Sequence, residues 1–130
     1  DLQRLELYDN LLTGSVPSEL GSMARLYTLS LSSNSLTGSI PSELGLLANL
    51  QVLWLTDNLF TGSIPSELGW LTDLKYLYLD GISLIGTVPD EVCALRDFNG
   101  GNLTRLYADC DEVECPCCTH CCFTGKCEVI

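Results

Sequence analysis

The amino-acid sequence predicts an α/β repeat solenoid, a stack of short coils that share one apolar interior. Three observations support this prediction: a leucine pattern that recurs every 24 residues, a glycine and a proline at fixed places in each copy, and eight cysteines that all follow residue 92. Self-similarity at periods of roughly 20 to 50 residues is typical of stacked supersecondary units. At 130 residues, the chain is long enough for one such core.

The repeats define the expected domain organisation. Four copies are expected over residues 2–25, 26–49, 50–73 and 74–97, so residues 1–97 form the repeat domain. Residues 98–130 are expected to form a degenerate last repeat and a cysteine-rich cap. The third copy shows the whole skeleton: Leu50, Leu53, Leu55, Asn58, Phe60, Thr61, Gly62, Ile64, Pro65, Leu68 and Gly69.

The first half of each copy is expected to form a strand and a turn. Leu-x-x-Leu-x-Leu places leucines on one face of a strand and the intervening residues on the other. The asparagine that follows should bond backbone groups which a tight turn leaves unpaired. This asparagine is present in the first three copies, whereas Ile82 replaces it in the fourth. The ladder asparagines are Asn10, Asn34 and Asn58.

The second half of each copy is expected to carry the chain back through a short helical segment. Glycine after the turn permits a backbone conformation that is closed to other residues. Proline is expected in the first turn of the helical segment, and a second glycine is expected to end it. These positions are Gly14, Gly38, Gly62 and Gly86; Pro17, Pro41, Pro65 and Pro89; and Gly21, Gly45 and Gly69. Since one coil cannot bury its own leucines, the coils must stack.

These copies resemble the plant-specific class of leucine-rich repeats. Its hallmark, Leu-Thr-Gly-x-Ile-Pro, stands at residues 36–41 and, with Phe60 in place of leucine, at residues 60–65. The class is known from plant receptor kinases and polygalacturonase inhibitors. Over residues 1–97, the resemblance implies a right-handed coil with a parallel concave β-sheet, short 3-10 or helical convex segments, and often a second short sheet. The cysteine-dense tail at residues 115–122 instead resembles the caps of diatom and algal leucine-rich-repeat proteins.

The cysteines predict disulfides and therefore a secreted or extracellular protein. The spacing around His120 also fits a zinc knuckle, but overlapping pairs would share cysteines, so disulfides are favoured and no metal is expected. His120 is then expected to be an exposed loop residue. Spacing does not choose the pairing, although Cys93 and Cys110 are expected to tie the last coil to the tail. The cysteines are Cys93, Cys110, Cys115, Cys117, Cys118, Cys121, Cys122 and Cys127.

The outward strand positions form the candidate ligand-binding face. Trp54, Tyr78 and Tyr107 fall in one column of adjacent copies, where aligned aromatic rings suit protein anchoring or sugar stacking. The alternative is cross-strand aromatic pairing that only stabilises the sheet. The candidate binding residues are Arg4, Glu6, Tyr8, Trp54, Thr56, Tyr76, Tyr78, Asp80, Arg105 and Tyr107.

Composition restricts the partners. The formal net charge of −11 disfavours nucleic acid and anionic membranes, and no apolar run is long enough to span a bilayer. Acids at the strand ends could gather calcium, but a generic acidic rim is the favoured interpretation. These acids are Asp9, Asp57, Asp80 and Asp109. Asn102-Leu103-Thr104 is a glycosylation sequon in an expected loop.

The sequence therefore predicts an extracellular recognition module for a protein, peptide or glycan. No enzyme activity and no cofactor are expected, because no nucleophile has a plausible base in its motif. One alternative is a self-assembling matrix or fibre component that stacks through an uncapped N-terminal end. The other, inhibition of a secreted hydrolase, rests on the resemblance alone. At that end, the leucines and valine expected to face water are Leu2, Leu5, Leu7, Leu12, Val16 and Leu20. The chain opens directly in a repeat, so we expect a longer parent or a removed leader.

Overall fold

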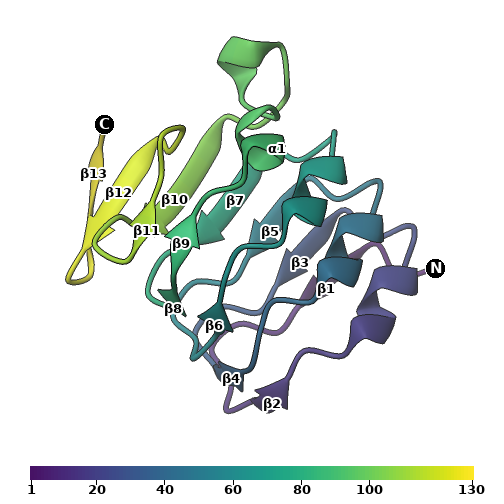
Figure 1. The fold of residues 1–130 in the computed structure, drawn as a ribbon. Helices are drawn as coiled ribbons and strands as arrows, with labels where there is room; N and C mark the ends of the chain where they lie inside the picture. The colour runs from purple at the N-terminus through teal and green to yellow at the C-terminus, as the bar shows by residue number, and fades with distance from the viewer.

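A computed structural model describes all 130 residues and shows stacked coils with one continuous sheet along one side (Figure 1). The sheet has seven strands in the order β1-β3-β5-β7-β10-β12-β13. All pairs are parallel except β12 with β13, which is antiparallel. The strands are β1 (Arg4–Glu6), β3 (Thr28–Ser30), β5 (Val52–Trp54), β7 (Tyr76–Leu79), β10 (Arg105–Asp109), β12 (His120–Phe123) and β13 (Lys126–Val129).

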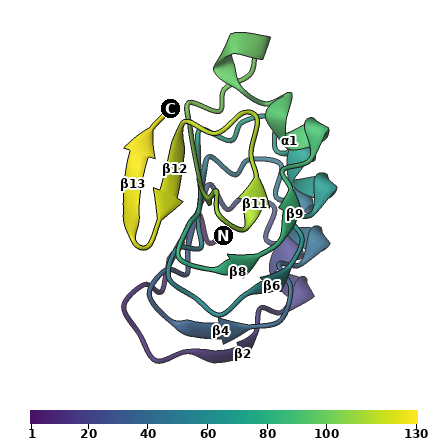
Figure 2. The same ribbon diagram turned by 60° about the vertical axis from the view of Figure 1, so that its left-hand side comes forward.

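The rest of each coil passes through a short second strand and a helical segment, so that the coils form closed loops in cross-section (Figure 2). The second strands pair as β2-β4, β6-β8 and β9-β11. They are β2 (Thr13–Ser15), β4 (Ser35–Thr37), β6 (Thr61–Gly62), β8 (Ser83–Leu84), β9 (Gly86–Thr87) and β11 (Val113–Glu114). The helical segments are the 3-10 helices η1 (Ser18–Ser22), η2 (Ser42–Leu46), η3 (Ser66–Trp70) and η4 (Asp97–Asn99), and the α-helix α1 (Asp90–Cys93).

Stacked leucines form the interior, which confirms the predicted solenoid. The parallel register places Leu29 beside Leu53 and Leu53 beside Leu77, and Leu77 in turn lies beside Leu106. All four of these side chains are fully buried. Because each coil covers the leucines of its neighbour, apolar burial supplies most of the stabilisation that no coil could provide alone.

The asparagine ladder links neighbouring turns as predicted. Asn58 donates from Nδ2 to the carbonyl oxygens of Leu31 (2.9 Å) and Leu55 (3.1 Å), and its Oδ1 accepts from the Leu36 N–H (3.1 Å). In the fourth copy Ile82 interrupts the ladder, and the backbone N–H groups of Gly81 and Ile82 donate to the Asp109 carboxylate of the next coil, both at 3.0 Å. One coil earlier, the equivalent N–H groups of Asp57 and Asn58 donate to the backbone carbonyl oxygens of Asp80 and Gly81. At the seam between the repeats and the cap, a side-chain carboxylate therefore replaces two backbone carbonyls.

The predicted roles of the helix-flanking residues need correction. Pro17 lies immediately before η1 and not in its first turn, with φ of −65° and ψ of 135°. Gly21 lies inside η1 and does not end it. A Cβ atom at Gly21 would collide with the backbone carbonyl of Glu43 in the next coil, so glycine is required by the close approach of two helices. The turn glycine Gly14 has the expected positive φ of 79°.

Four disulfides build the cap: Cys93–Cys117, Cys110–Cys121, Cys115–Cys118 and Cys122–Cys127. The prediction that Cys93 and Cys110 tie the last coil to the tail is confirmed. No cysteine is free, so the zinc-knuckle alternative has no thiolates to use. Cys117, Cys118 and Cys121 join the buried core and cover the last leucines.

The N-terminal coil has no equivalent cover. Leu2, Leu7 and Leu12 are 45%, 36% and 38% exposed, and Leu5 and Leu20 are half-buried. Val16 is buried at 6%, so the expectation that it faces water was wrong, because the next coil already covers it. The two chain ends lie at opposite ends of the stack (Figure 1).

Candidate recognition surface

The outward face of the seven-stranded sheet, called the wall here, carries the predicted binding residues. Seven of the ten lie within strands β1, β5, β7 and β10, and their side chains share one face because they alternate with buried leucines. Three lie one or two residues beyond a strand end. These three are Tyr8, Thr56 and Asp80.

A column of four rings crosses the wall. Trp54 and Tyr78 have ring centroids 5.2 Å apart, and Tyr78 and Tyr107 are 4.8 Å apart. The column then continues to His120, which stacks on Tyr107 at 4.1 Å with the planes 16° apart. Trp54, at the other end, is 44% exposed. Such contacts stabilise a sheet by about 1 kcal/mol per pair and also hold the rings rigid for a ligand.

The prediction that His120 is an exposed loop residue was wrong. His120 lies in β12, which pairs in parallel with β10 so that His120 is opposite Tyr107. The sequence signal was weak, since the strand His-Cys-Cys-Phe has none of the leucine alternation of the repeats. The dense cysteines predict an irregular cap, whereas backbone pairing with β10 and the Cys110–Cys121 disulfide hold this segment against the sheet.

Two arginines stand over tyrosines on the wall. The Arg105 guanidinium lies 5.8 Å from the Tyr76 ring centroid and the Arg4 guanidinium 6.0 Å from that of Tyr27. A hydrogen bond to the Tyr78 side chain, first among several causes, raises the pKa of Arg105 above its ordinary value. Both side chains are therefore cations held near aromatic rings on a strongly acidic molecule.

The wall is not one continuous patch of predicted residues. Strand β3 lies between β1 and β5, and its outward residues Thr28 and Ser30 are small and buried, as is Ser32 just beyond it. Arg4 and Glu6 on β1 are thereby separated from the aromatic column. The structure thus divides the ten candidates into an N-terminal charged group and a larger aromatic group toward the cap.

The acidic rim is partly used for structure. Asp80 accepts a hydrogen bond from the Thr56 hydroxyl at 3.0 Å, and Asp109 accepts from the backbone N–H groups of Gly81 and Ile82. Burial, with the nearby charges of Asp109 and Asp57, raises the pKa of Asp80. Asp80 gathers with Cys122 and Cys127, but those two sulfurs are bonded to each other, so this group lacks the thiolates that a metal needs.

The sequon lies in an exposed loop. Asn102 donates from Nδ2 to the Thr72 carbonyl oxygen at 3.0 Å, and Thr104 donates to the carbonyl oxygen of Lys75 at 3.1 Å. Asn102 is exposed in the folded chain. Its glycosylation stays a prediction.

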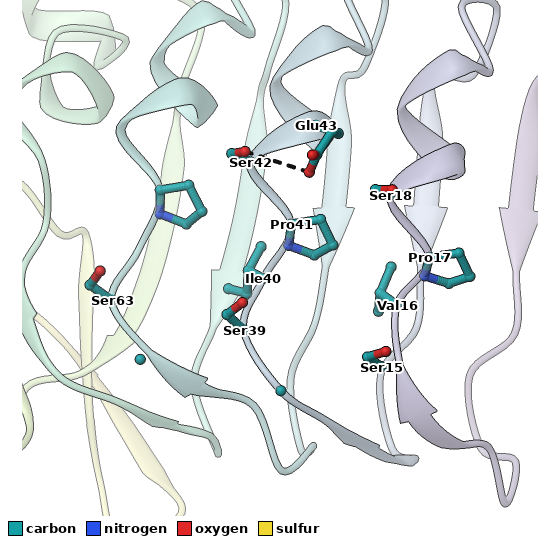
Figure 3. Close-up of a pocket in the computed structure, with 13 residues that line it drawn as sticks. Ser15, Val16, Pro17, Ser18, Ser39, Ile40, Pro41, Ser42, Glu43 and Ser63 are labelled. Atoms are coloured by element: carbon teal, nitrogen blue, oxygen red, sulfur yellow. Dashed lines mark hydrogen bonds between the residues drawn. The ribbon is translucent and has the colours of Figure 1, made fainter.

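A second surface feature lies between the second strands and the 3-10 helices. Serines and prolines of three successive coils recur there in aligned rows (Figure 3). They line an open groove of about 840 Å³ whose walls are mostly serine, proline and glycine. The repeated residues are Ser15, Ser39 and Ser63; Pro17, Pro41 and Pro65; and Ser18 and Ser42. The repeat pattern alone gave no reason to expect a surface formed by these hydroxyls.

The repeats identify the family. The Leucine Rich Repeat family model matches residues 1–23, 25–47 and 49–71, which together are more than half of the chain. The chain belongs to the leucine-rich-repeat family. The exact bounds of the four expected 24-residue units stay a prediction. A comparison with curated proteins finds no match.

Solved plant structures share the fold of this leucine-rich-repeat protein. A chain in the BIR3–SERK2 complex from Arabidopsis thaliana is 46% identical, with 70% of this chain and 49% of that chain covered and a TM-score of 0.68. A chain in the complex of the Arabidopsis receptor kinase HAESA with the peptide hormone IDA and the co-receptor SERK1 is 32% identical (87% and 18% covered, TM-score 0.76). A plant ice-binding protein is 30% identical (88% and 35% covered, TM-score 0.71).

This leucine-rich-repeat protein spans half or less of each of those chains. The expected resemblance to plant leucine-rich repeats is confirmed, whereas the resemblance of the cap to diatom and algal caps stays a prediction. None of the helices is both long enough and apolar enough to cross a membrane.

Proposed function

We propose that this protein is an extracellular recognition module that binds a peptide or protein ligand on the aromatic part of its wall. The observation that carries the proposal is the four-ring column, which ends in an exposed indole at Trp54. Rigid aromatic rings bury much area on binding at little cost in conformational entropy, so they make effective anchors.

The relatives support an extracellular setting and a peptide ligand. One similar structure contains a receptor kinase with a peptide hormone, and another contains PEPR1 with AtPEP1. Four disulfides agree with an oxidising compartment. Binding without catalysis is the simplest role for an open wall that offers no enclosed pocket around a nucleophile.

Charge sets the expected ligand chemistry. Arg105 provides a fixed cation beside Tyr76, while Asp57 and Asp80 lie at the neighbouring strand ends. A ligand that crosses β7 and β10 would therefore meet a cation and carboxylates within one footprint. We propose a segment with an apolar or aromatic anchor for Trp54, an acidic group for Arg105 and a basic group for the acidic rim.

The test uses two tryptophans that differ only in place. A random peptide display library is selected on the whole disulfide-bonded chain, and captured peptides are measured again on Trp54→Ala and Trp70→Ala. Trp70 lies on η3 and is 59% exposed, so it matches Trp54 in type and exposure but is off the wall. We expect at least about tenfold weaker binding for Trp54→Ala only.

Equal binding by both variants would refute the proposed site, provided thermal unfolding shows that both remain folded. A glycan array probed in parallel distinguishes a sugar ligand, which would also lose affinity in Trp54→Ala. If the column only stabilises the sheet, Trp54→Ala lowers the unfolding temperature but leaves every captured ligand bound.

We infer ice binding as a second candidate, located at the groove of Figure 3. A regular two-dimensional array of hydroxyls can order water, and the coils repeat at about the 4.8 Å spacing of paired strands. The similarity to a plant ice-binding protein supports this candidate. The serines already named line this groove, and Thr13, Thr37 and Thr61 recur at exposed positions of the adjacent strands β2, β4 and β6.

Inhibition of ice recrystallisation by the purified chain tests the second candidate. Ser39→Tyr places a bulky ring in the middle of the groove and should abolish the effect. Thr56→Tyr, on the wall, should leave it unchanged. Growth of ice crystals at the same rate with and without the wild-type chain would exclude ice binding.

A further inference from the structure

The cysteine-rich cap adds one side chain to the wall that the repeats do not supply. Strand β12 lies beside β10 and pairs with it in parallel, with His120 opposite Tyr107 (Figure 1). The next residue, Cys121, is buried, so His120 faces outward by the alternation of a strand. Its ring stacks on Tyr107 with the centroids 4.1 Å apart. His120 is thus the one ring of the aromatic column that can become a cation.

Hydrogen bonds hold this ring in a position that suits its protonated form. The Thr119 hydroxyl accepts from the Leu106 N–H at 2.9 Å and donates to the Leu106 carbonyl oxygen at 3.1 Å. His120 Nδ1 lies 3.0 Å from the same hydroxyl oxygen. Because the single proton of that hydroxyl is already used, Nδ1 is the donor of this bond. Nε2 makes no hydrogen bond within the chain, so protonation adds a donor there and leaves the existing bonds in place.

The charged residues of β10 are engaged on its other side, toward β7. The Arg105 guanidinium lies over the Tyr76 ring, 5.8 Å from its centroid. Both carboxylate oxygens of Asp109 accept backbone N–H groups from the residues that follow β7. Tyr107, which lies between these two residues along the strand, is the stacking partner itself. Strand β10 therefore leaves His120 without a charged partner.

Strand β13, on the other side of β12, places no charge beside His120 on the wall. Its residue opposite His120 is Val129, which is 76% exposed. Its two charged residues, Lys126 and Glu128, are an odd number of positions from Val129, so they lie on the opposite face of the strand. The three ion pairs of the chain all involve arginine. A charge on His120 is therefore available to a ligand.

His120 also lies at a distance from Trp54 that a short peptide can span. The two residues are three strand spacings apart in the sheet, which is about 14 Å. An extended peptide advances about 3.4 Å per residue, so side chains about four positions apart match this distance. Side chains at that interval also point to the same face of an extended segment. One peptide can therefore contact the indole and the imidazole together.

We propose that His120 is a ligand-binding residue of the wall, where its protonated ring binds an acidic side chain about four positions from the apolar anchor on Trp54. The inference rests on the proposed peptide-binding function and adds the ligand chemistry at the cap end of the site. The Nε2–H group donates a charge-assisted hydrogen bond to the carboxylate of the ligand. Since histidine changes charge between about pH 5 and pH 8, affinity should rise as the pH falls through this range.

The test selects peptides from a random display library on the whole disulfide-bonded chain at about pH 5.5 and measures them again at about pH 7.5. Captured peptides that depend on Trp54 should carry aspartate or glutamate about four positions from an apolar residue. They should bind about fivefold more tightly at the lower pH. The same peptides with that acid replaced by its amide should bind equally at both pH values.

Two substitutions separate the charge of His120 from its ring. His120→Phe keeps a ring on Tyr107 without the charge, so it should bind weakly at both pH values. His120→Arg keeps a planar cation at both, so it should bind tightly at both. Lys126→Gln removes a charge from the opposite face of the neighbouring strand and should keep the wild-type pH dependence. Circular dichroism at both pH values checks that every variant is folded.

Nuclear magnetic resonance tests the contact directly, because the chain has one histidine and its ring proton signal needs no assignment. Added peptide should shift this signal, and an unshifted signal would place the ligand elsewhere. Equal binding of wild type at both pH values would overturn the role of His120 and leave the peptide site intact. A pH dependence that persists in His120→Phe would also overturn it and would point to Asp80, whose pKa burial raises. A library that yields no peptide dependent on Trp54 would refute the peptide site itself.

Discussion

The first and last coils of the solenoid differ in how far their leucines are buried. At the C-terminal end, the last leucines, Leu103 and Leu106, are fully buried beneath a segment held by four disulfides. At the N-terminal end, Leu2, Leu7 and Leu12 remain at least a third exposed, and the first cysteine in the chain is Cys93. Apolar side chains are therefore buried differently in the first and last coils of residues 1–130.

The difference indicates which interactions stabilise each coil. Central coils gain from neighbours on both sides, the last coil gains from covalent cross-links, and the first coil gains from one neighbour only. Equivalent substitutions in different coils should therefore lower the free energy of unfolding by different amounts. Four predictions follow from this contrast, beginning with the largest expected effect.

Leucine truncation is expected to have the largest effect. Leu53→Ala should lower the free energy of unfolding by about 3–4 kcal/mol, because it opens a cavity in a fully buried layer. Leu5→Ala, at the same repeat position on the half-buried edge strand, should cost only about 1 kcal/mol. Urea titrations followed by circular dichroism measure both. Equal costs would mean that the first coil is already covered in solution.

The disulfides are expected to stabilise the folded chain by different amounts, according to the length of the loop that each one closes. Replacing Cys93 and Cys117 together by alanine should cost about 3 kcal/mol, because that bond spans 24 residues and joins α1 to the cap. Replacing Cys115 and Cys118 together should cost about 2 kcal/mol, because that bond spans three residues. Thermal unfolding without reductant separates the two. A reversed order would show that native-state strain outweighs chain entropy.

A buried and an exposed ladder asparagine should also differ in how much they stabilise the fold, by a smaller amount than the leucines do. Asn58→Ala removes three donated hydrogen bonds and leaves the Leu36 N–H without its acceptor, so we expect a loss of about 2 kcal/mol. Asn10→Ala, at an exposed position, should cost about 0.5 kcal/mol, since water replaces the amide. Chemical denaturation quantifies the pair. A large loss at Asn10 alone would contradict this gradient.

Asp80 should give the smallest effect, and it depends on pH. Its pKa is raised in the folded chain, chiefly by burial, so the folded state holds a proton that the unfolded state has already lost. This contribution to stability is therefore fully present at low pH and declines as pH rises from 3.8 through the folded-state pKa. Asp80→Asn, which still accepts from Thr56, should be more stable than wild type at pH 7, by less than about 1 kcal/mol.

The difference between Asp80→Asn and wild type should shrink toward zero near pH 3. Comparing the unfolding temperatures of the two proteins at both pH values isolates Asp80 from the other sixteen acids, which titrate in both. A difference that stays constant with pH would show that the carboxylate is not destabilised by its site. A larger difference at pH 3 would reverse the sign and contradict the burial argument.

The repeat part of the fold could be predicted because its information is periodic. Leu29, Leu53 and Leu77 recur at the same phase, and each needs only the next coil to be buried. The aromatic column could be predicted from the same repeat positions for its rings up to Tyr107. His120 could not be predicted, because its strand lacks the spacing of the repeats and joins the wall through pairing with β10 and a disulfide that follow from no repeating interval.

The sequence by itself determined the coil period, the buried leucine set, the ladder asparagines and the sealing of one end by cysteines. These features are local or link one coil to the next, so spacing alone specifies them. Only the tertiary structure decided the cysteine pairing, the antiparallel β13, the use of the Asp109 carboxylate in place of backbone carbonyls and the packing role of Gly21. Each of these features is a contact between residues that have no fixed spacing in the sequence. Such contacts form only when the segments outside the repeat pattern fold back on the coils, so the repeat period does not predict them.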